Sequence, residues 1–105
     1  TNVSRCAARF ELDAPPAGPA VLKIEGQDSE KAWAAPPRIQ IWVNDRKIFD
    51  GKNEFPKRDW GWRQYAIPAG TLHRGANTIE VRNLAPTDSL GAKWIMFSEV
   101  RIESQ

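Results

Sequence analysis

The chain has 105 residues, a formal net charge of +2 and one cysteine. This length suits one domain, the lone cysteine excludes an internal disulfide, and the small charge gives no reason to expect nucleic acid. No run is apolar enough to cross a membrane. Five tryptophans are more than a small sandwich core uses. The chain begins at Thr1 with no signal-peptide pattern, so we expect a mature or excised module of a longer protein.

Seven short segments, most of them with alternating polar and apolar residues, predict β-strands. In chain order, the expected strands cover residues 5–12, 21–26, 38–44, 47–49, 62–67, 78–82 and 94–103. No stretch has the period of a useful amphipathic helix. This pattern predicts an all-β fold, a single antiparallel β-sandwich domain over residues 1–105.

The alternation also predicts which side chains face the core. Cys6 shares a face with Phe10, so a buried structural thiol is expected. Ile41 and Val43 point inward, which places Trp42 on the outer face of its sheet, either as a binding surface or under a loop.

The stretch from residue 59 to residue 82 contains two strands and the turn between them. Pro68 ends the first strand because it has no amide hydrogen. Gly70 and Gly75 permit positive φ, so the chain can turn tightly, and Leu72 is expected to plug the bottom of the core.

The closing strand is apolar on both sides in its first half. Loops or a bulge must therefore cover one side of it. Its even-numbered face consists of Trp94, Met96, Val100 and Ile102, and Ile95 and Phe97 lie on the other face.

If consecutive strands reverse direction, the connections alternate between two ends of the sandwich. The short connections 13–19, 44–47 and 68–76 then fall at one end. The longer polar connections 27–37, 50–61 and 84–93 fall at the other end, which becomes rich in tryptophan.

The loop tryptophans are candidate sugar platforms, since sugar rings stack their C–H faces on aromatic side chains. Trp60 is the strongest candidate, because Gly61 beside it should let a ring approach the backbone. Trp33 and Trp94 are left open between ligand contact and a lid on the core. Trp62 also borders this end, but it begins a strand and a core position is favoured.

Charged residues around this end offer hydrogen bonds to sugar hydroxyls. Asp28 and Asp59 suit vicinal hydroxyls, and Lys57 or Arg58 suits the carboxylate of a uronate. For any one of them, a solvated loop position is the simpler interpretation. Acids and bases alternate here, which disfavours a groove for single-stranded nucleic acid.

Nothing in the sequence has the spacing of an active site. His73 is the only histidine, and it lies in the turn at the opposite end. No zinc spacing, P-loop or dinucleotide fingerprint occurs. We therefore expect no catalytic residue.

Several segments carry a family resemblance: residues 10–13, 21–26, 41–45 and 65–81, and the closing segment 94–102. The most specific is the Ile-Pro…Leu…Gly-x-Asn-Thr-Ile pattern that starts at Ile67. Together they resemble the galactose-binding-domain-like jelly rolls, especially the carbohydrate-binding modules of rhamnogalacturonan lyases and other polysaccharide-degrading enzymes. The resemblance covers nearly the whole chain.

This resemblance implies a non-catalytic module that binds a polysaccharide or oligosaccharide and targets an attached enzyme to it. It also implies a monomeric, secreted or cell-surface bacterial domain, and a structural calcium ion for which Glu11, Glu99 and Glu103 are the candidate carboxylates. The alternative is a structural sandwich that packs against a neighbouring catalytic domain through the same aromatic end.

Overall fold

The seven expected strands are all present in the structure, a computed structural model that describes residues 4–28, 38–56, 59–84 and 95–104. Their ends differ from the expected ones by at most three residues. The strands are β1 (Ser4–Leu12), β2 (Ala20–Asp28), β3 (Arg38–Val43), β4 (Arg46–Lys52), β5 (Gly61–Ile67), β6 (Gly75–Asn83) and β7 (Ile95–Ser104). No described segment forms a helix that could span a membrane.

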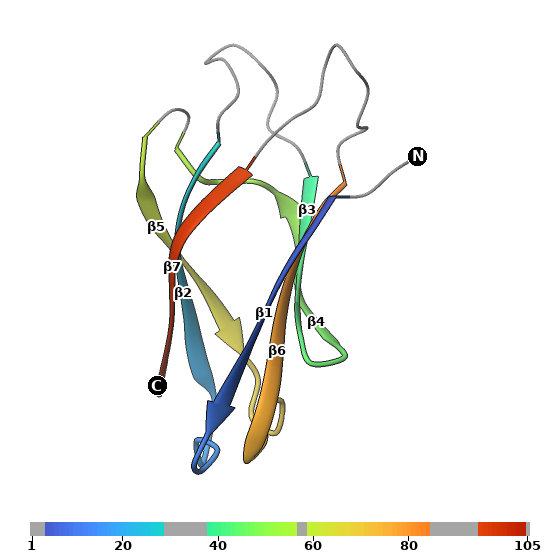
Figure 1. Ribbon diagram of the computed structural model, residues 1–105, viewed down its shortest axis with the longest axis vertical. Coiled ribbons are helices and arrows are strands. Elements are labelled where there is room, and N and C mark those ends of the chain that lie inside the picture. Colours follow the sequence, from blue (N-terminus) through green and yellow to red (C-terminus); the bar gives the residue numbers. More distant parts are fainter. Residues whose placement is uncertain (1–3, 29–37, 57–58, 85–94, 105) are drawn as a thin grey trace.

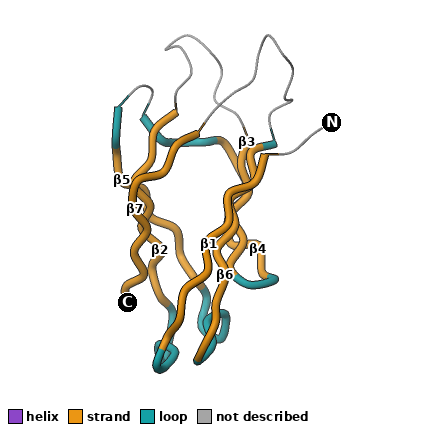
Figure 2. Tube along the Cα trace, viewed as in Figure 1, coloured by secondary structure: helices purple, strands orange, loops and turns teal. Residues whose placement is uncertain are grey.

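Two antiparallel sheets pack as a sandwich (Figures 1 and 2). The four-stranded sheet has the order β1-β6-β3-β4, and the three-stranded sheet has the order β5-β2-β7. The predicted all-β antiparallel sandwich is confirmed.

The core forms where the alternating faces of both sheets meet. Leu22, Ile41 and Val43 are fully buried, and Leu72 closes the bottom of the core as predicted. Because Ile41 and Val43 point inward, Trp42 lies on the outer face of the four-stranded sheet, also as predicted.

The turn end of the sandwich is built around a buried asparagine. Gly70 and Gly75 adopt φ of +82° and +91°, which confirms their predicted role. The chain between these two glycines folds around the side chain of Asn77, which lies just after them in β6. This side chain donates to the carbonyls of His73 and Gly75 and accepts from the His73 amide. The Asn44 side chain also donates to Asn77 Oδ1, which links this turn to the β3–β4 hairpin.

β7 departs from the predicted facing of its residues. The register with β2 shifts between Glu25 and Gly26, so that Glu25 pairs with Glu99 and Gly26 with Phe97, and Ser98 is the extra residue. A bulge of this kind exchanges the two faces of a strand. Phe97 therefore packs against the core, on the same side as Ile102, whereas alternation alone had placed it opposite.

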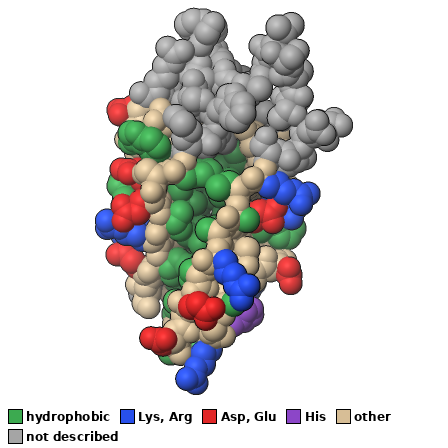
Figure 3. Space-filling view, viewed as in Figure 1, with side chains coloured by type: hydrophobic (Ala, Val, Ile, Leu, Met, Phe, Trp, Pro, Cys, Tyr) green, Lys and Arg blue, Asp and Glu red, His purple; other side chains and the backbone are tan. Residues whose placement is uncertain are grey.

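The sandwich is open along one side, between the edge strands β1 and β7. An apolar groove of about 390 Å³ lies there, and Figure 3 shows hydrophobic side chains exposed between the two layers. Its lining residues are Ala8, Phe10, Leu12, Ile79, Val100 and Ile102. Cys6 is exposed, so the prediction of a buried thiol was wrong: it assumed that the second layer covers this end of β1.

The described strand ends agree with the predicted division of the connections between two ends, while residues 29–37 and 85–94 of two long connections lie outside the described residues. The turns at residues 13–19 and 68–74 lie at the lower end in Figure 1. At the opposite end, β2 and β6 end and β3 and β7 begin, and the described residues of the β4–β5 connection lie there too. The pairs Asp28–Ile95 and Gly26–Gly61 show this arrangement. We call this the aromatic end, after Trp60 and Trp62.

Candidate functional site

Two tryptophans of the aromatic end are exposed to solvent. The exposed fraction is 44% for Trp60, in the β4–β5 connection, and 36% for Trp62, at the start of β5. The core position favoured for Trp62 was therefore wrong. Tyr65 and Ile67 are the inward residues of β5, and alternation places Trp62 with the outward ones.

The connection that carries Trp60 is anchored in the core. Phe55 is buried and makes an edge-to-face contact with Phe97, with ring centroids 5.6 Å apart. The buried Asn53 accepts a hydrogen bond of 3.0 Å from the Phe55 amide. Sequence reasoning treated this segment as a polar loop and missed Phe55, whose only signal is an isolated aromatic residue.

Arg63 ties the same connection to β5. Its Nε atom donates to the Glu54 carbonyl at 2.8 Å, and its Nη1 atom donates to the Trp62 carbonyl at 2.7 Å. Pro56 lies against Gly61, where a side chain would collide with its ring. Gly61 is thus needed for packing, and the space expected beside Trp60 for a ligand is partly filled by Pro56.

Asp59 interacts with the backbone of the neighbouring tryptophan. Its Oδ1 atom accepts a hydrogen bond of 2.9 Å from the Trp60 amide. The residue is exposed, so its carboxylate can be reached from solvent. An acceptor thus lies beside the backbone of an exposed tryptophan, and sequence analysis proposed an acceptor and an aromatic ring together for a sugar.

Trp62 has a cationic neighbour that sequence analysis missed. The Arg101 guanidinium, on β7, lies 5.0 Å from the centre of the Trp62 ring. Glu99 holds it with a hydrogen bond of 2.9 Å, which raises the pKa of Arg101. The two residues are far apart in the sequence and come together only because β5 and β7 both pair with β2.

Several of the predicted site residues lie outside the described residues. These are Trp33, Trp94, Lys57 and Arg58. The Asp28 backbone ends β2 opposite Ile95, at the aromatic end, but its side chain is likewise outside the description. Of the predicted set, the structure thus brings together Trp60, Trp62 and Asp59.

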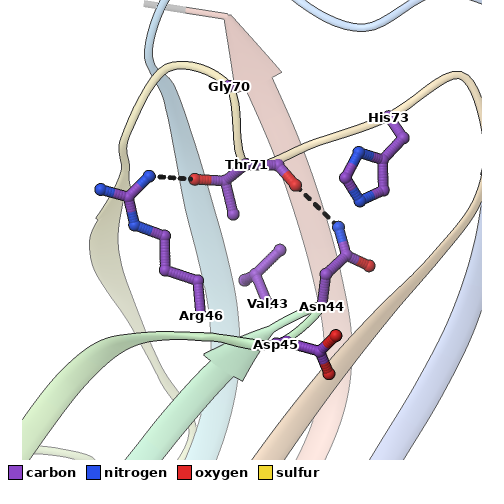
Figure 4. Close-up of a pocket in the computed structure, with 7 residues that line it drawn as sticks. All are labelled: Val43, Asn44, Asp45, Arg46, Gly70, Thr71 and His73. Atoms are coloured by element: carbon purple, nitrogen blue, oxygen red, sulfur yellow. Dashed lines mark hydrogen bonds between the residues drawn. The ribbon is translucent and has the colours of Figure 1, made fainter.

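The opposite end contains a pocket of about 290 Å³ (Figure 4). Its lining residues are Val43, Asn44, Asp45, Arg46, Gly70, Thr71 and His73. Asn44 donates to the Thr71 carbonyl at 2.8 Å, and Arg46 donates to the Thr71 hydroxyl at 3.2 Å. These bonds join the β3–β4 hairpin to the β5–β6 turn, so we assign the pocket a structural role.

The carboxylates considered for calcium are divided between the two sheets. Glu11 lies on β1, whereas Glu103 on β7 forms an ion pair with Lys23. Glu99 forms an ion pair with Arg101. Within the described part of the chain, no group of three His, Cys, Asp or Glu side chains is suited to hold a metal ion. Calcium needs six to eight oxygen ligands, so these residues do not fit such a site.

In comparisons with protein-family models, with curated proteins and with solved structures, no match to this chain was found.

Proposed function

We propose that this domain is a non-catalytic carbohydrate-binding module whose ligand binds at the aromatic end. The observation that supports this most directly is the exposure of Trp60, on a connection that is firmly held, and of Trp62, at the start of β5. Exposed indole rings favour a binding role, because they cost solubility when no ligand covers them.

The chemistry around the two rings suits a sugar. An indole presents an apolar face to the C–H face of a pyranose, while Asp59 and Arg101 supply an acceptor and donors for its hydroxyls. Because Phe55 and Arg63 fix the connection, little conformational entropy is lost when a ligand binds.

The likeness to galactose-binding-domain-like jelly rolls gives this proposal its biological setting. On this view the chain is a monomeric module of a bacterial polysaccharide-degrading enzyme, secreted or on the cell surface, which it targets to its substrate. No reaction is assigned to the module itself.

Affinity gel electrophoresis with a panel of soluble polysaccharides, with and without EDTA, tests the proposal. Retardation of the protein by at least one glycan supports the proposal. If EDTA does not change this retardation, the binding does not depend on a metal ion. If no glycan retards the protein, the proposal fails.

A second candidate function is favoured by the apolar groove between β1 and β7, where Val100 is 41% exposed. Such a groove is typical of a surface that packs against a neighbouring domain. This candidate predicts that the isolated domain binds the hydrophobic dye ANS, that Val100→Lys removes the dye signal, and that no glycan binds. Glycan binding that Val100→Lys leaves intact would reject this candidate as the main function.

A further inference from the structure

The outer face of the four-stranded sheet, here called the basic face, is more positive than the rest of the molecule. Its described cationic residues are Arg5, Arg9, Arg38, Lys47, Lys52 and Arg82, and its carboxylates are Glu11, Asp50 and Glu80. Six cations against three carboxylates leave an excess of three positive charges, on a chain whose net charge is +2. The outer face of the other sheet has two cations against three carboxylates: Lys23, Arg101, Glu25, Glu99 and Glu103.

Two of the carboxylates are each held by two cations. Asp50 accepts from Arg38 at 2.7 Å and from Lys47 at 3.1 Å. Glu80 pairs with Arg82 at 2.7 Å and with Arg5 at 3.6 Å. The hydrogen bond from Arg38 is the main reason that the pKa of Asp50 falls to about 2, and Arg82 lowers the pKa of Glu80. Both carboxylates are thus ionised at neutral pH, and each cluster still carries one net positive charge.

Trp42 lies between these two clusters and stiffens them. Its indole nitrogen donates to Gln40 Oε1 at 3.2 Å, and Gln40 in turn donates to Asp50. The Arg82 guanidinium lies 4.5 Å from the centre of the ring, and the Lys47 ammonium lies at 6.0 Å. Stacked guanidinium groups keep their N–H edges available for carboxylate or sulfate oxygens.

We infer that the basic face binds an acidic polysaccharide, one that carries carboxylate or sulfate groups along its chain. The inference rests on the proposed glycan-binding function and adds the charge of the ligand and a second contact surface. A regularly charged chain can pair with several of the cations at once, and each pairing adds to affinity.

Single-stranded nucleic acid, another polyanion, fits the basic face less well. Binding of this kind uses several exposed aromatic residues on which successive bases stack. Among the residues that the structure describes on this face, Trp42 is the only aromatic one; it is half-buried and already in contact with Arg82. The charges are therefore present without the stacking platforms.

The test compares two variants of equal net charge. Arg9→Gln/Lys52→Gln removes two exposed cations of the basic face, neither of which is ion-paired with another described residue. Lys23→Gln/Arg74→Gln removes two cations from elsewhere. Affinities for dextran sulfate, alginate, uncharged dextran and oligo(dT) are measured by titration calorimetry at about 50 and 200 mM salt.

We expect the first variant to bind dextran sulfate or alginate about 5- to 10-fold more weakly than the unmodified protein, and the second to change by less than about 2-fold. Equal losses in both variants would mean unspecific attraction and would overturn the inference. Tighter binding of oligo(dT) than of either acidic polysaccharide would overturn it in favour of nucleic acid.

The experiments distinguish a failure of the inference about the basic face from a failure of the proposed function. If Trp60→Ala abolishes glycan binding while Arg9→Gln/Lys52→Gln leaves affinity for the acidic chains unchanged, only the inference about the basic face is wrong. If no glycan binds, whether acidic or uncharged, the proposed function fails and the inference fails with it.

Discussion

Pro56 packs against Gly61 so closely that a Cβ atom at position 61 would lie 2.6 Å from Pro56 Cγ. Real Cβ atoms do not approach a ring this closely, so Gly61→Ala must displace the connection that carries Trp60. We expect a loss of about 1–3 kcal/mol in the free energy of unfolding, measured by urea denaturation.

Gly18→Ala is the matched control for this substitution, because no atom beyond its two chain neighbours lies within 4 Å of a Cβ built at Gly18. Its effect on stability should be small. If both alanine variants unfold at the same urea concentration as the unmodified protein, the packing role assigned to Gly61 is incorrect.

Asn77 should be the most sensitive polar residue at the turn end. It is 1% exposed, and its side chain makes hydrogen bonds with His73, Gly75 and Asn44. Asn77→Ala removes all of these hydrogen bonds at once, and we expect a loss of about 2–4 kcal/mol in the free energy of unfolding.

His73→Ala is the control for Asn77→Ala, since His73 contributes its backbone to this network and its side chain is exposed. It should change neither stability nor glycan binding noticeably. If folded His73→Ala protein no longer binds glycan, the binding site lies at the turn end and not at the aromatic end.

Tyr65 should make stability depend on alkaline pH. Burial, assisted by the Glu54 carboxylate, raises the pKa of Tyr65 to about 12, from 10.0 in an exposed tyrosine. The folded protein thus holds this proton more tightly than the unfolded chain does. The stability that neutral Tyr65 contributes is complete below about pH 10 and is lost as the pH rises toward 12.

Tyr65→Phe removes this dependence and a buried hydroxyl that has no hydrogen-bond partner in the described structure. At neutral pH the variant should be as stable as the unmodified protein or slightly more stable. Thermal melts of both proteins near pH 7 and pH 11 measure the difference. If the melting temperatures of both proteins fall equally between about pH 7 and pH 11, groups other than Tyr65 cause the alkaline destabilisation.

Cys6 should react in the folded state. Its side chain is exposed beside the open groove, so a thiol reagent such as DTNB should modify it without prior unfolding. Cys6→Ala should change stability by less than about 0.5 kcal/mol, because no buried cavity is created. If Cys6 reacts with DTNB only after denaturant is added, its thiol is covered in the folded protein.

The strands could be predicted because their signal is local. In β3, the buried residues Ile39, Ile41 and Val43 alternate with positions that are exposed or only partly buried, and this spacing alone defines a strand and its inner face. The turn glycines were equally readable, since Gly70 and Gly75 need a backbone conformation that other residues rarely adopt.

Most of the errors concern features that depend on neighbouring strands. Trp62 is the exception, because alternation with Tyr65 already places it on the outer face of β5. Cys6 is exposed because the sandwich is open between β1 and β7. Phe97 changes face because of a bulge in the pairing of β2 with β7. Pairing partners and bulges are set by contacts distant in sequence, and so is the position of Arg101 over Trp62.

The most direct test of the proposed function is the substitution Trp60→Ala, with affinity and stability measured on the same protein. Since the Trp60 side chain is 44% exposed, stability should fall by less than about 1 kcal/mol. Loss of a stacking platform should weaken binding of the best glycan from the panel by about 2 kcal/mol or more, a factor of roughly 30. Trp60→Tyr, which keeps an aromatic plate, should retain most of the affinity. Unchanged glycan affinity in Trp60→Ala, or a stability loss of about 3–5 kcal/mol as expected for a lid on the core, would contradict the platform role.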